Sequence, residues 1–488
     1  MDELINKIEE KLTGEGKRLS VVCNPDGFLK RPDTQQEVLN ACGLLLLPIS
    51  SSLELRVRYE LTDKNSNERI CYIMDNVKEI LPDIGMHIHY SPDFNITDMF
   101  PACDETEIRL AQLNFGMVAY LYSKHFVYNL SAIETQNVVN DAKTLFGKTD
   151  QELISELDEI PLNWEDVSTI DSISRVILKS IKQDVYDRLE AKIAEINNSF
   201  QKFIDQKYFG LVSSSHVNRP KMVHKVLPHL AYKYERTKKV ALVVIDGMAY
   251  WQYLVLEQRL NQYQLPITKN LTFSWLPSIT KLSRQAIFRG DIPRADYKQS
   301  PDSECKLWDG YWMERCKSSQ RMKEYEIAYT HDSLLTSNGL PYKQAFVDVS
   351  LDHKMHSSSD NRDLYSLTEN WATEASESIN ELYKLGYTIV ITTDHGNIMA
   401  HRWRALNSQE RTLLYEKESR GSRHLMYSKQ EYLYDFLQKN KEIESELLIH
   451  DNWAVWRNNQ CFKGQDEITH GGSHFLEVVI PFITITNN

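Results

Sequence analysis

Acidic and imidazole side chains follow two apolar runs in the second half of the chain. The run VALVVI ends at Asp246, and the run YTIVITT ends at Asp394 and His395. Each run predicts a buried strand, and the carboxyl ends of strands are where an open α/β sheet binds its ligands. Two carboxylates and an imidazole at that edge are suitable ligands for a divalent ion such as zinc or manganese.

Two further segments offer ligands of the same kinds. Asp352 and His356 lie four positions apart, a spacing that puts both on one face of a helical turn at chelating distance. His470 precedes two glycines that let the backbone bring its side chain inward. Each segment alone could be a turn or a surface pair, whereas the four together favour a metal centre. His353 and His474 are rival ligands; the spacing favours His356 over His353, and we expect His474 to pack in the core or at the surface.

Thr280 is the candidate nucleophile. It lies between an extended, proline-containing stretch and a helix expected to start near Leu282. The free N–H groups at a helix N-terminus can hold a phosphoryl oxygen, and a metal bound to the hydroxyl would lower its pKa enough for attack on phosphorus. A plain N-cap role is the alternative from this segment alone. Ser278 and Ser283 are other nearby hydroxyls.

Three arginines are candidates for binding a substrate phosphate. Arg284 lies one helical turn after Thr280 and could clamp a phosphoryl oxygen with two hydrogen bonds. Arg420 and Arg423 follow the Asp394 segment and could bind phosphate in the same way. An ordinary salt bridge, or a solvated surface loop for Arg420 and Arg423, is the alternative.

Short β-rich runs alternate with helical segments around these residues, which predicts a mostly parallel sheet flanked by helices over residues 237–488. Residues 1–140 predict a smaller α/β domain, with strands near 18–23, 43–49, 53–61 and 68–75 and a turn containing Asp26. Residues 141–236 show apolar residues at intervals of three and four, which predicts a helical connector. Its charges suit a solvated face or an interaction surface.

The composition limits the classes of function. A chain of 488 residues with 42% hydrophobic and 25% charged residues predicts a folded protein of two or more domains. No apolar run is long enough to cross a bilayer and no signal peptide is apparent, so we expect a cytoplasmic protein. The seven cysteines contain no C-x-x-C pair, and the formal charge of −12 offers no basic field for a long nucleic acid. A phosphate on the substrate must then be held by local cations.

From about residue 236 to the end, the chain resembles the PglZ domain of the alkaline phosphatase superfamily, on the segments IDGM, PSIT, DHKMH, TTDHG and THGG. The resemblance implies two divalent ions, usually zinc, with manganese as the other candidate. One ion would be bound by Asp246, Asp394, His395 and Thr280, and the other by Asp352, His356 and His470. It also implies that Thr280 is the nucleophile. The first half resembles the amino-terminal region of PglZ proteins of BREX-type bacteriophage defence systems, on NPDGFL and RVRYEL.

The resemblance implies a metal-dependent phosphatase or phosphodiesterase that acts on nucleotides or oligonucleotides through a phosphothreonine-type intermediate. Its expected setting is bacterial phage defence, with other defence-system proteins as partners and no membrane. Two alternatives are a phosphomutase-like phosphotransferase and a non-catalytic scaffold stabilised by metal. The sequence leaves open the natural substrate and whether the protein forms a homo-oligomer.

Overall fold

The computed structural model describes residues 2–14, 16–215, 217–234, 238–294, 296–317, 326–334, 340–415 and 419–487. Contacts divide the chain into two compact units, Met1–Glu152 and Leu153–Asn488. Within the described ranges, no helix combines the length and apolar character needed to cross a membrane. The boundary expected at residues 236–237 lies outside the described residues, and the division into three functional domains stays a prediction.

The first unit contains a parallel sheet with the strand order β2-β3-β1-β4. Its strands are β1 (Leu19–Cys23), β2 (Leu44–Pro48), β3 (Arg69–Met74) and β4 (His89–Tyr90). Its helices include α1 (Asp2–Leu12), α2 (Pro32–Cys42), α5 (Glu105–Leu110), α6 (Phe115–Tyr122) and α7 (Ala132–Phe146). After β1, the Asp26 carboxylate accepts hydrogen bonds from the backbone N–H groups of Phe28 and Ile96. It therefore stabilises a turn.

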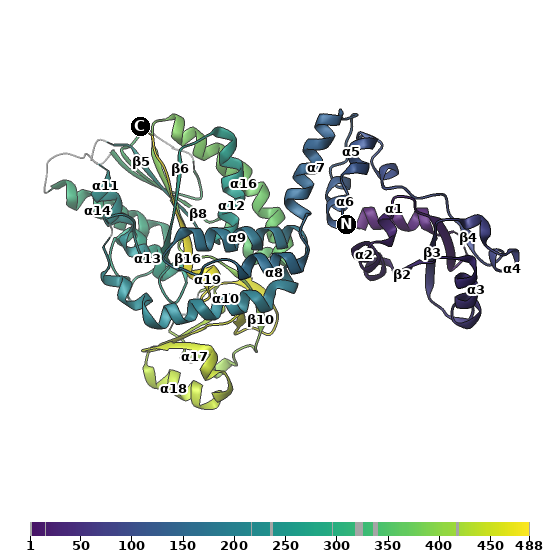
Figure 1. Cartoon of the computed structure of the whole chain (residues 1–488). Helices are drawn as coiled ribbons and strands as arrows, with labels where there is room; N and C mark the ends of the chain where they lie inside the picture. The colour runs from purple at the N-terminus through teal and green to yellow at the C-terminus, as the bar shows by residue number, and fades with distance from the viewer. Residues whose placement is uncertain are drawn as a thin grey trace. The chain divides into compact units, whose positions relative to one another are not determined.

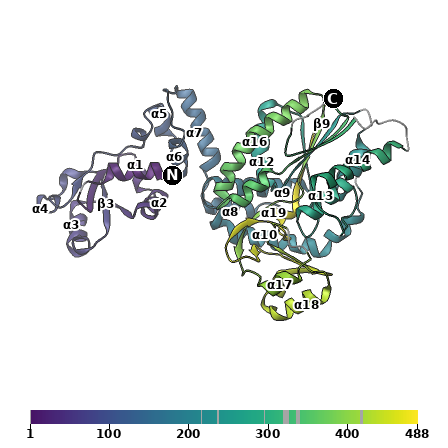
Figure 2. The ribbon, with the colours of Figure 1, turned by 180° about the vertical axis from the view of Figure 1, so that it is seen from behind.

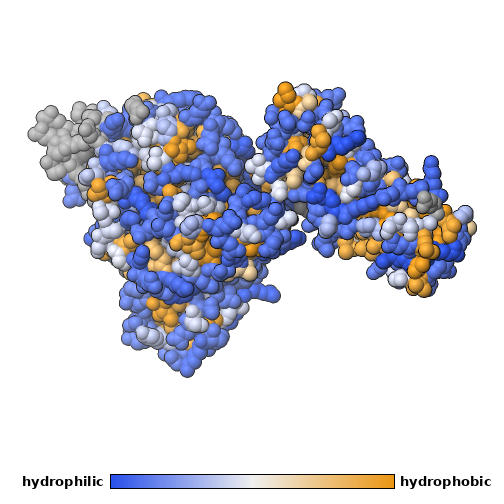
Figure 3. Space-filling model, viewed as in Figure 1, coloured by the Kyte–Doolittle hydropathy of each residue, from blue (hydrophilic) through white to orange (hydrophobic). Residues whose placement is uncertain are grey.

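The strand predicted at residues 53–61 is wrong, because this segment is the helix α3 (Ser52–Leu61). Ser51 caps it by accepting a hydrogen bond from the backbone N–H of Glu54. Apolar and charged residues alternate strictly here, which is the strand pattern, yet only Leu55 and Tyr59 are buried, four residues apart on one helical face. Three apolar residues on the other faces of α3 are exposed, namely Leu53, Val57 and Leu61. Hydrophobic residues are visible on the surface of this region in Figure 3.

The second unit is built on a six-stranded sheet with the order β6-β16-β9-β5-β8-β7. Its strands are β5 (Val240–Ile245), β6 (Ile267–Phe273), β7 (Ile327–His331), β8 (Lys343–Asp348), β9 (Thr388–Thr392) and β16 (Val479–Ile485). Neighbouring strands from β7 to β9 are parallel, and β16 alone runs against its neighbours β9 and β6. The predicted α/β fold with a mostly parallel sheet is confirmed.

Helices cover both faces of this sheet (Figures 1 and 2). Alternate residues of β5 point to opposite faces: Ala241 and Val243 pack with one core cluster, and Leu242 and Val244 with another. The first face is covered by α9 (Val167–Lys182), α10 (Tyr186–Gln206), α12 (Tyr250–Leu260) and α16 (Asn361–Lys384). The second is covered by α11 (Val226–Lys233), α13 (Thr280–Arg289) and α14 (Pro301–Lys317). Two helices of the expected connector, α9 and α10, thus share the core of the sheet.

A small lobe, unexpected from the sequence, is inserted between β9 and β16. Its own apolar core packs three antiparallel strands, β11 (His424–Met426), β12 (Leu447–His450) and β13 (Trp453–Trp456), with α18 (Gln430–Lys439). The helix α17 (Ser408–Leu413) lies beside them, as Figure 1 shows. The short strands β10 (Ile398–Arg402), β14 (Gln460–Cys461) and β15 (Glu467–Thr469) form another small sheet in this segment.

Candidate metal centre

Three predicted ligands meet where β5 and β9 end side by side. Asp246 follows β5, and Asp394 and His395 lie two and three residues beyond β9. One ligand atom from each lies within 4.8 Å of the others, and all three residues are buried. The turn after Asp246 uses Gly247 at φ 73°, a conformation that favours glycine, and its N–H donates to Asp394 Oδ1 at 3.1 Å. We call Asp246, Asp394 and His395 the first group.

Thr280 lies at the edge of the first group. The helix α13 begins at Thr280, and its N-cap is Ile279, which makes no side-chain cap. The Thr280 hydroxyl lies 3.1 Å from His395 Nε2 and 3.4 Å from Asp246 Oδ1. Its oxygen therefore faces the first group instead of capping the helix, so the plain N-cap alternative does not hold.

The remaining predicted ligands form a second group, Asp352, His356 and His470. Asp352 and His356 share a face of α15 (Ser350–Ser357), with His356 Nε2 3.3 Å from Asp352 Oδ1. His470 follows β15, and ligand atoms of the three lie within 4.8 Å of one another. The rings of His470 and His395 stack with centroids 3.9 Å apart. The two groups are therefore direct neighbours.

Two backbone carbonyls orient the central imidazoles. His395 Nδ1 lies 2.9 Å from the Gly396 carbonyl, and His470 Nδ1 lies 2.9 Å from the Ser278 carbonyl. Because a carbonyl oxygen only accepts, each Nδ1 must carry a proton, and in the neutral form of such a ring Nε2 is the atom with the lone pair. This is the usual arrangement of a metal-binding histidine.

The donor set fits a bound cation. Asp394 Oδ2 is buried and has no hydrogen-bond donor among the described residues. Burial and the nearby Asp394 charge raise the pKa of Asp246 well above its usual value, and burial raises the pKa of Asp394 as well. Burial also favours the neutral form of His470, whose pKa is well below the usual value. Buried carboxylates and neutral imidazoles match the ligand preferences of zinc and manganese.

The rival histidines lie outside the two groups. His353 lines a cavity that is also lined by Asp246, Asp352 and His470. His474 is buried and caps the short helix α19 (Phe475–Val478), where its Nδ1 accepts a hydrogen bond from the backbone N–H of Leu476 at 3.2 Å. His474 thus has a structural role, in line with the packing role expected of it.

The two serine hydroxyls near Thr280 form hydrogen bonds with backbone groups. Ser278 Oγ donates to the Gly472 carbonyl at 2.7 Å and accepts from the Gly471 N–H. Ser283 Oγ accepts from the backbone N–H of Trp275 at 3.1 Å. Both serines are fully buried, so of these three hydroxyls it is that of Thr280 that faces the first group.

Two of the three arginines pair with buried protein carboxylates, which favours an ordinary salt bridge over the predicted contact with substrate phosphate. Arg284 is buried and donates to Asp246 Oδ2 at 2.8 Å and to both oxygens of Glu304. Arg423 is fully buried and donates to Glu477 at 3.1 Å. Their guanidinium groups are engaged by protein carboxylates, and neither lines the cavity at the centre. Arg284 holds Asp246 in place.

The third arginine lines a cavity of about 450 Å³ that opens onto both groups. Arg420 is exposed and its Nη1 lies 3.2 Å from Asp352 Oδ2. Lys281 and Lys298 line the same cavity, together with Thr280. We call this the metal-centre cavity. Its basic side chains stand beside the carboxylates of the two groups, an arrangement suited to an anionic ligand.

Two buried acids near the centre were not predicted from the sequence. Glu304 on α14 accepts from Arg284, and Glu477 accepts from Arg423 and from the backbone N–H of Gly472, which is two residues after His470. Both acids are fully buried. No local signal distinguishes them, because their partners are distant in the sequence.

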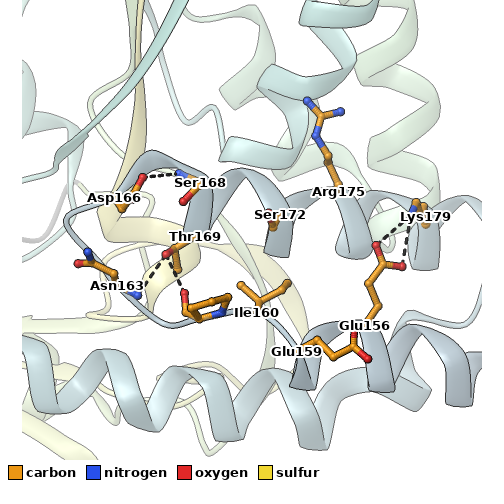
Figure 4. Close-up of a pocket in the computed structure, with 11 residues that line it drawn as sticks. Glu156, Glu159, Ile160, Asn163, Asp166, Ser168, Thr169, Ser172, Arg175 and Lys179 are labelled. Atoms are coloured by element: carbon orange, nitrogen blue, oxygen red, sulfur yellow. Dashed lines mark hydrogen bonds and ion pairs between the residues drawn. The ribbon is translucent and has the colours of Figure 1, made fainter.

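A larger cavity, of about 650 Å³, lies between α8 (Asp150–Asp158) and α9 (Figure 4). Several of the polar groups that line it form ion pairs or hydrogen bonds with one another. Lys179 pairs with Glu156 at 3.2 Å, and Thr169 Oγ1 donates to the Pro161 carbonyl and accepts from the backbone N–H of Asn163. None of the ligand candidates lines it. Size alone therefore does not identify the site.

Comparison with known proteins supports the sequence resemblance. The family model described as the BREX system PglZ alkaline phosphatase-like domain matches residues 222–485. No match is found among the curated proteins. Two similar solved structures are distant from this chain. Murine ectonucleotide pyrophosphatase/phosphodiesterase 5 in complex with AMP is 12% identical, with a TM-score of 0.34 over 51% of this chain and 87% of the other. Phosphonoacetate hydrolase from Sinorhizobium meliloti is 13% identical, with a TM-score of 0.34 over 51% and 90%.

Proposed function

The chain belongs to the family of the BREX system PglZ alkaline phosphatase-like domain, and from this premise we propose that it is a metal-dependent phosphatase or phosphodiesterase. Its substrates are nucleotides or oligonucleotides. The observation that carries the proposal is the position of Thr280, whose hydroxyl lies 3.1 Å from His395 Nε2 beside two groups of buried ligands.

The first group and Thr280 would hold one divalent ion, and the second group would hold another, with zinc as the main candidate and manganese as the other. When bound, such a pair supplies Lewis acidity that stabilises charge on the attacking and leaving oxygens. The buried Asp394 Oδ2, which has no donor among the described residues, is the strongest structural sign that a cation belongs here.

Thr280 acts as the nucleophile. Its Oγ1 forms a bond to phosphorus as the bond from phosphorus to the leaving oxygen breaks, and the hydroxyl proton passes through water in the cavity to that oxygen, which departs as the alcohol. The helix α13 begins at Thr280, and the backbone N–H of Thr280 in its first turn can hold a phosphoryl oxygen, since the first N–H groups of a helix have no carbonyl four residues before them in the helix. Water then hydrolyses the phosphothreonine and restores the hydroxyl.

Basic residues of the metal-centre cavity bind the substrate phosphate. Lys281, Lys298 and Arg420 line the cavity, and they supply the local cations that a chain with a net charge of −12 needs in order to hold a phosphate. Arg420 can form two parallel hydrogen bonds to one phosphate, which a lysine cannot.

We place this activity in bacterial anti-phage defence, in the cytoplasm and alongside other defence-system proteins, because the matching family takes its name from the BREX system. A non-catalytic scaffold would not require a hydroxyl facing the ligand groups. A phosphotransferase of the mutase kind would need an acceptor other than water.

The test is hydrolysis of a generic phosphodiester and a generic phosphomonoester by the full chain, with zinc, with manganese and after chelation. We expect metal-dependent turnover that Thr280→Ala abolishes and Thr280→Ser partly retains. Thr373→Ala is the matched control, because Thr373 is an exposed threonine on α16 whose hydroxyl bonds only to its own helix in the described structure.

Full metal-dependent activity in Thr280→Ala would refute the nucleophile. Absence of turnover in protein shown to contain metal would favour the scaffold. Phosphate transfer to an added sugar, without release of inorganic phosphate, would favour the phosphotransferase.

A further inference from the structure

A second cavity adjoins the metal-centre cavity on the side of the small lobe. It has a volume of about 320 Å³, and Ser419 and Arg420 line both cavities. The shared segment is close to the metal centre, because a side chain at Gly421 would lie 2.8 Å from the His470 carbonyl and 2.9 Å from its ring. We call this second space the lobe cavity. Both volumes lie in the range of roughly 300–1,000 Å³ that is usual for small-ligand sites.

The charged residues that line the lobe cavity, among those the structure describes, are all basic. Arg411, Arg420 and Lys463 line it, and among the described residues no aspartate or glutamate does. The Lys463 ammonium lies 3.7 Å from the Glu467 carboxylate, and both Arg411 and Lys463 are exposed. A cationic hollow on a chain of net charge −12 is suited to an anionic group of the ligand.

One wall of the lobe cavity is apolar and firmly packed. It contains Leu406, Leu414 and Phe462. Phe462 is buried in the lobe core, with its ring centroid 5.0 Å from that of Trp456 and 5.8 Å from that of Trp403. An inorganic anion would not use such a wall, whereas an organic group that carries a phosphate would.

We propose that the lobe cavity is a subsite for a second phosphate of the substrate and the nucleoside face that carries it, with Arg411 and Lys463 as its phosphate ligands. The proposal rests on the proposed function, because the first phosphate lies at Thr280. Arg420, in the shared wall, lies between the two phosphates. The subsite selects substrates with phosphates on both sides of a nucleoside, as in an oligonucleotide, over nucleoside monophosphates.

The experiment measures binding, so it does not depend on turnover. The full chain, loaded with zinc, is titrated with thymidine monophosphate and with thymidine 3′,5′-bisphosphate, which differs by one phosphate. We expect the bisphosphate to bind about tenfold or more tightly, since a charge-assisted contact changes affinity on that scale. The double variant Arg411→Ala/Lys463→Ala should reduce this preference to about threefold or less.

The matched control is Lys439→Ala/Lys441→Ala, which removes the same charge from exposed positions of the same lobe that do not line the cavity. It should keep the preference for the bisphosphate. Equal binding of the two nucleotides by the natural sequence, binding of neither, an unchanged preference in Arg411→Ala/Lys463→Ala, or an equal loss in the control would each overturn the subsite. Failure of the hydrolysis test while this preference holds would instead count against the proposed reaction.

Discussion

Replacing Arg284 with methionine should destabilise the second unit and weaken its metal centre together. Arg284 is buried and neutralises two buried carboxylates, donating to Asp246 Oδ2 at 2.8 Å and to Glu304 at 2.7 and 2.6 Å. Breaking a buried ion pair by removing one partner costs about 3–5 kcal/mol. With roughly 2 °C per kcal/mol for a large domain, we expect the melting temperature to fall by about 6–10 °C.

Thermal unfolding with and without zinc measures this change. The variant Arg284→Met/Glu304→Gln should recover part of the loss, because it removes one of the two unpaired charges. The alternative role of Arg284, a clamp on substrate phosphate, makes the opposite prediction. An Arg284→Met protein with unchanged melting temperature and zinc binding, and with only a raised KM, would refute the structural role and restore the clamp.

Two further perturbations follow from close contacts. Gly421→Ala should lower metal-dependent hydrolysis at least several-fold while the protein stays folded, because its Cβ would lie 2.8 Å from the His470 carbonyl; an unchanged rate would show that the segment can move freely. Burial lowers the pKa of His224 from 6.5 to about 4. Because the pKa of His224 is lower in the folded than in the unfolded state, the unfolded state binds a proton first as the pH falls. The contribution of His224 to the free energy of unfolding is therefore highest above pH 6.5 and decreases as the pH falls towards about 4. His224→Gln should therefore flatten the fall in melting temperature over that range, and an unchanged slope would contradict this.

The grouping of the candidate ligand residues was predictable because each follows a recognisable local pattern. Asp246 and Asp394 follow apolar strand runs, and parallel neighbouring strands bring such residues to one edge of the sheet. Asp352 and His356 have helical spacing. The roles of these residues as metal ligands stay predictions until an ion is observed.

The arginines show where the sequence does not suffice. Arg284 has the spacing of a phosphate clamp, yet its partner Glu304 lies 20 residues away and approaches through the packing of α14 against α13. Arg423 likewise meets Glu477, 54 residues later. Tertiary contacts of this kind leave no periodic signal. The strand prediction for residues 53–61 was wrong for a different reason. The strict alternation of apolar and charged residues is typical of a strand, while the Ser51 cap and the packing of one face favour a helix.

The metal content of the protein tests the central claim most directly. The full chain is incubated with zinc, desalted and analysed by inductively coupled plasma mass spectrometry. The two groups of buried ligands predict about two zinc ions per chain, and about one in the variant Asp352→Ala/His356→Ala, which removes two ligands of the second group. Less than one ion per chain in the natural sequence, or the same content in the variant, would contradict the two-metal centre.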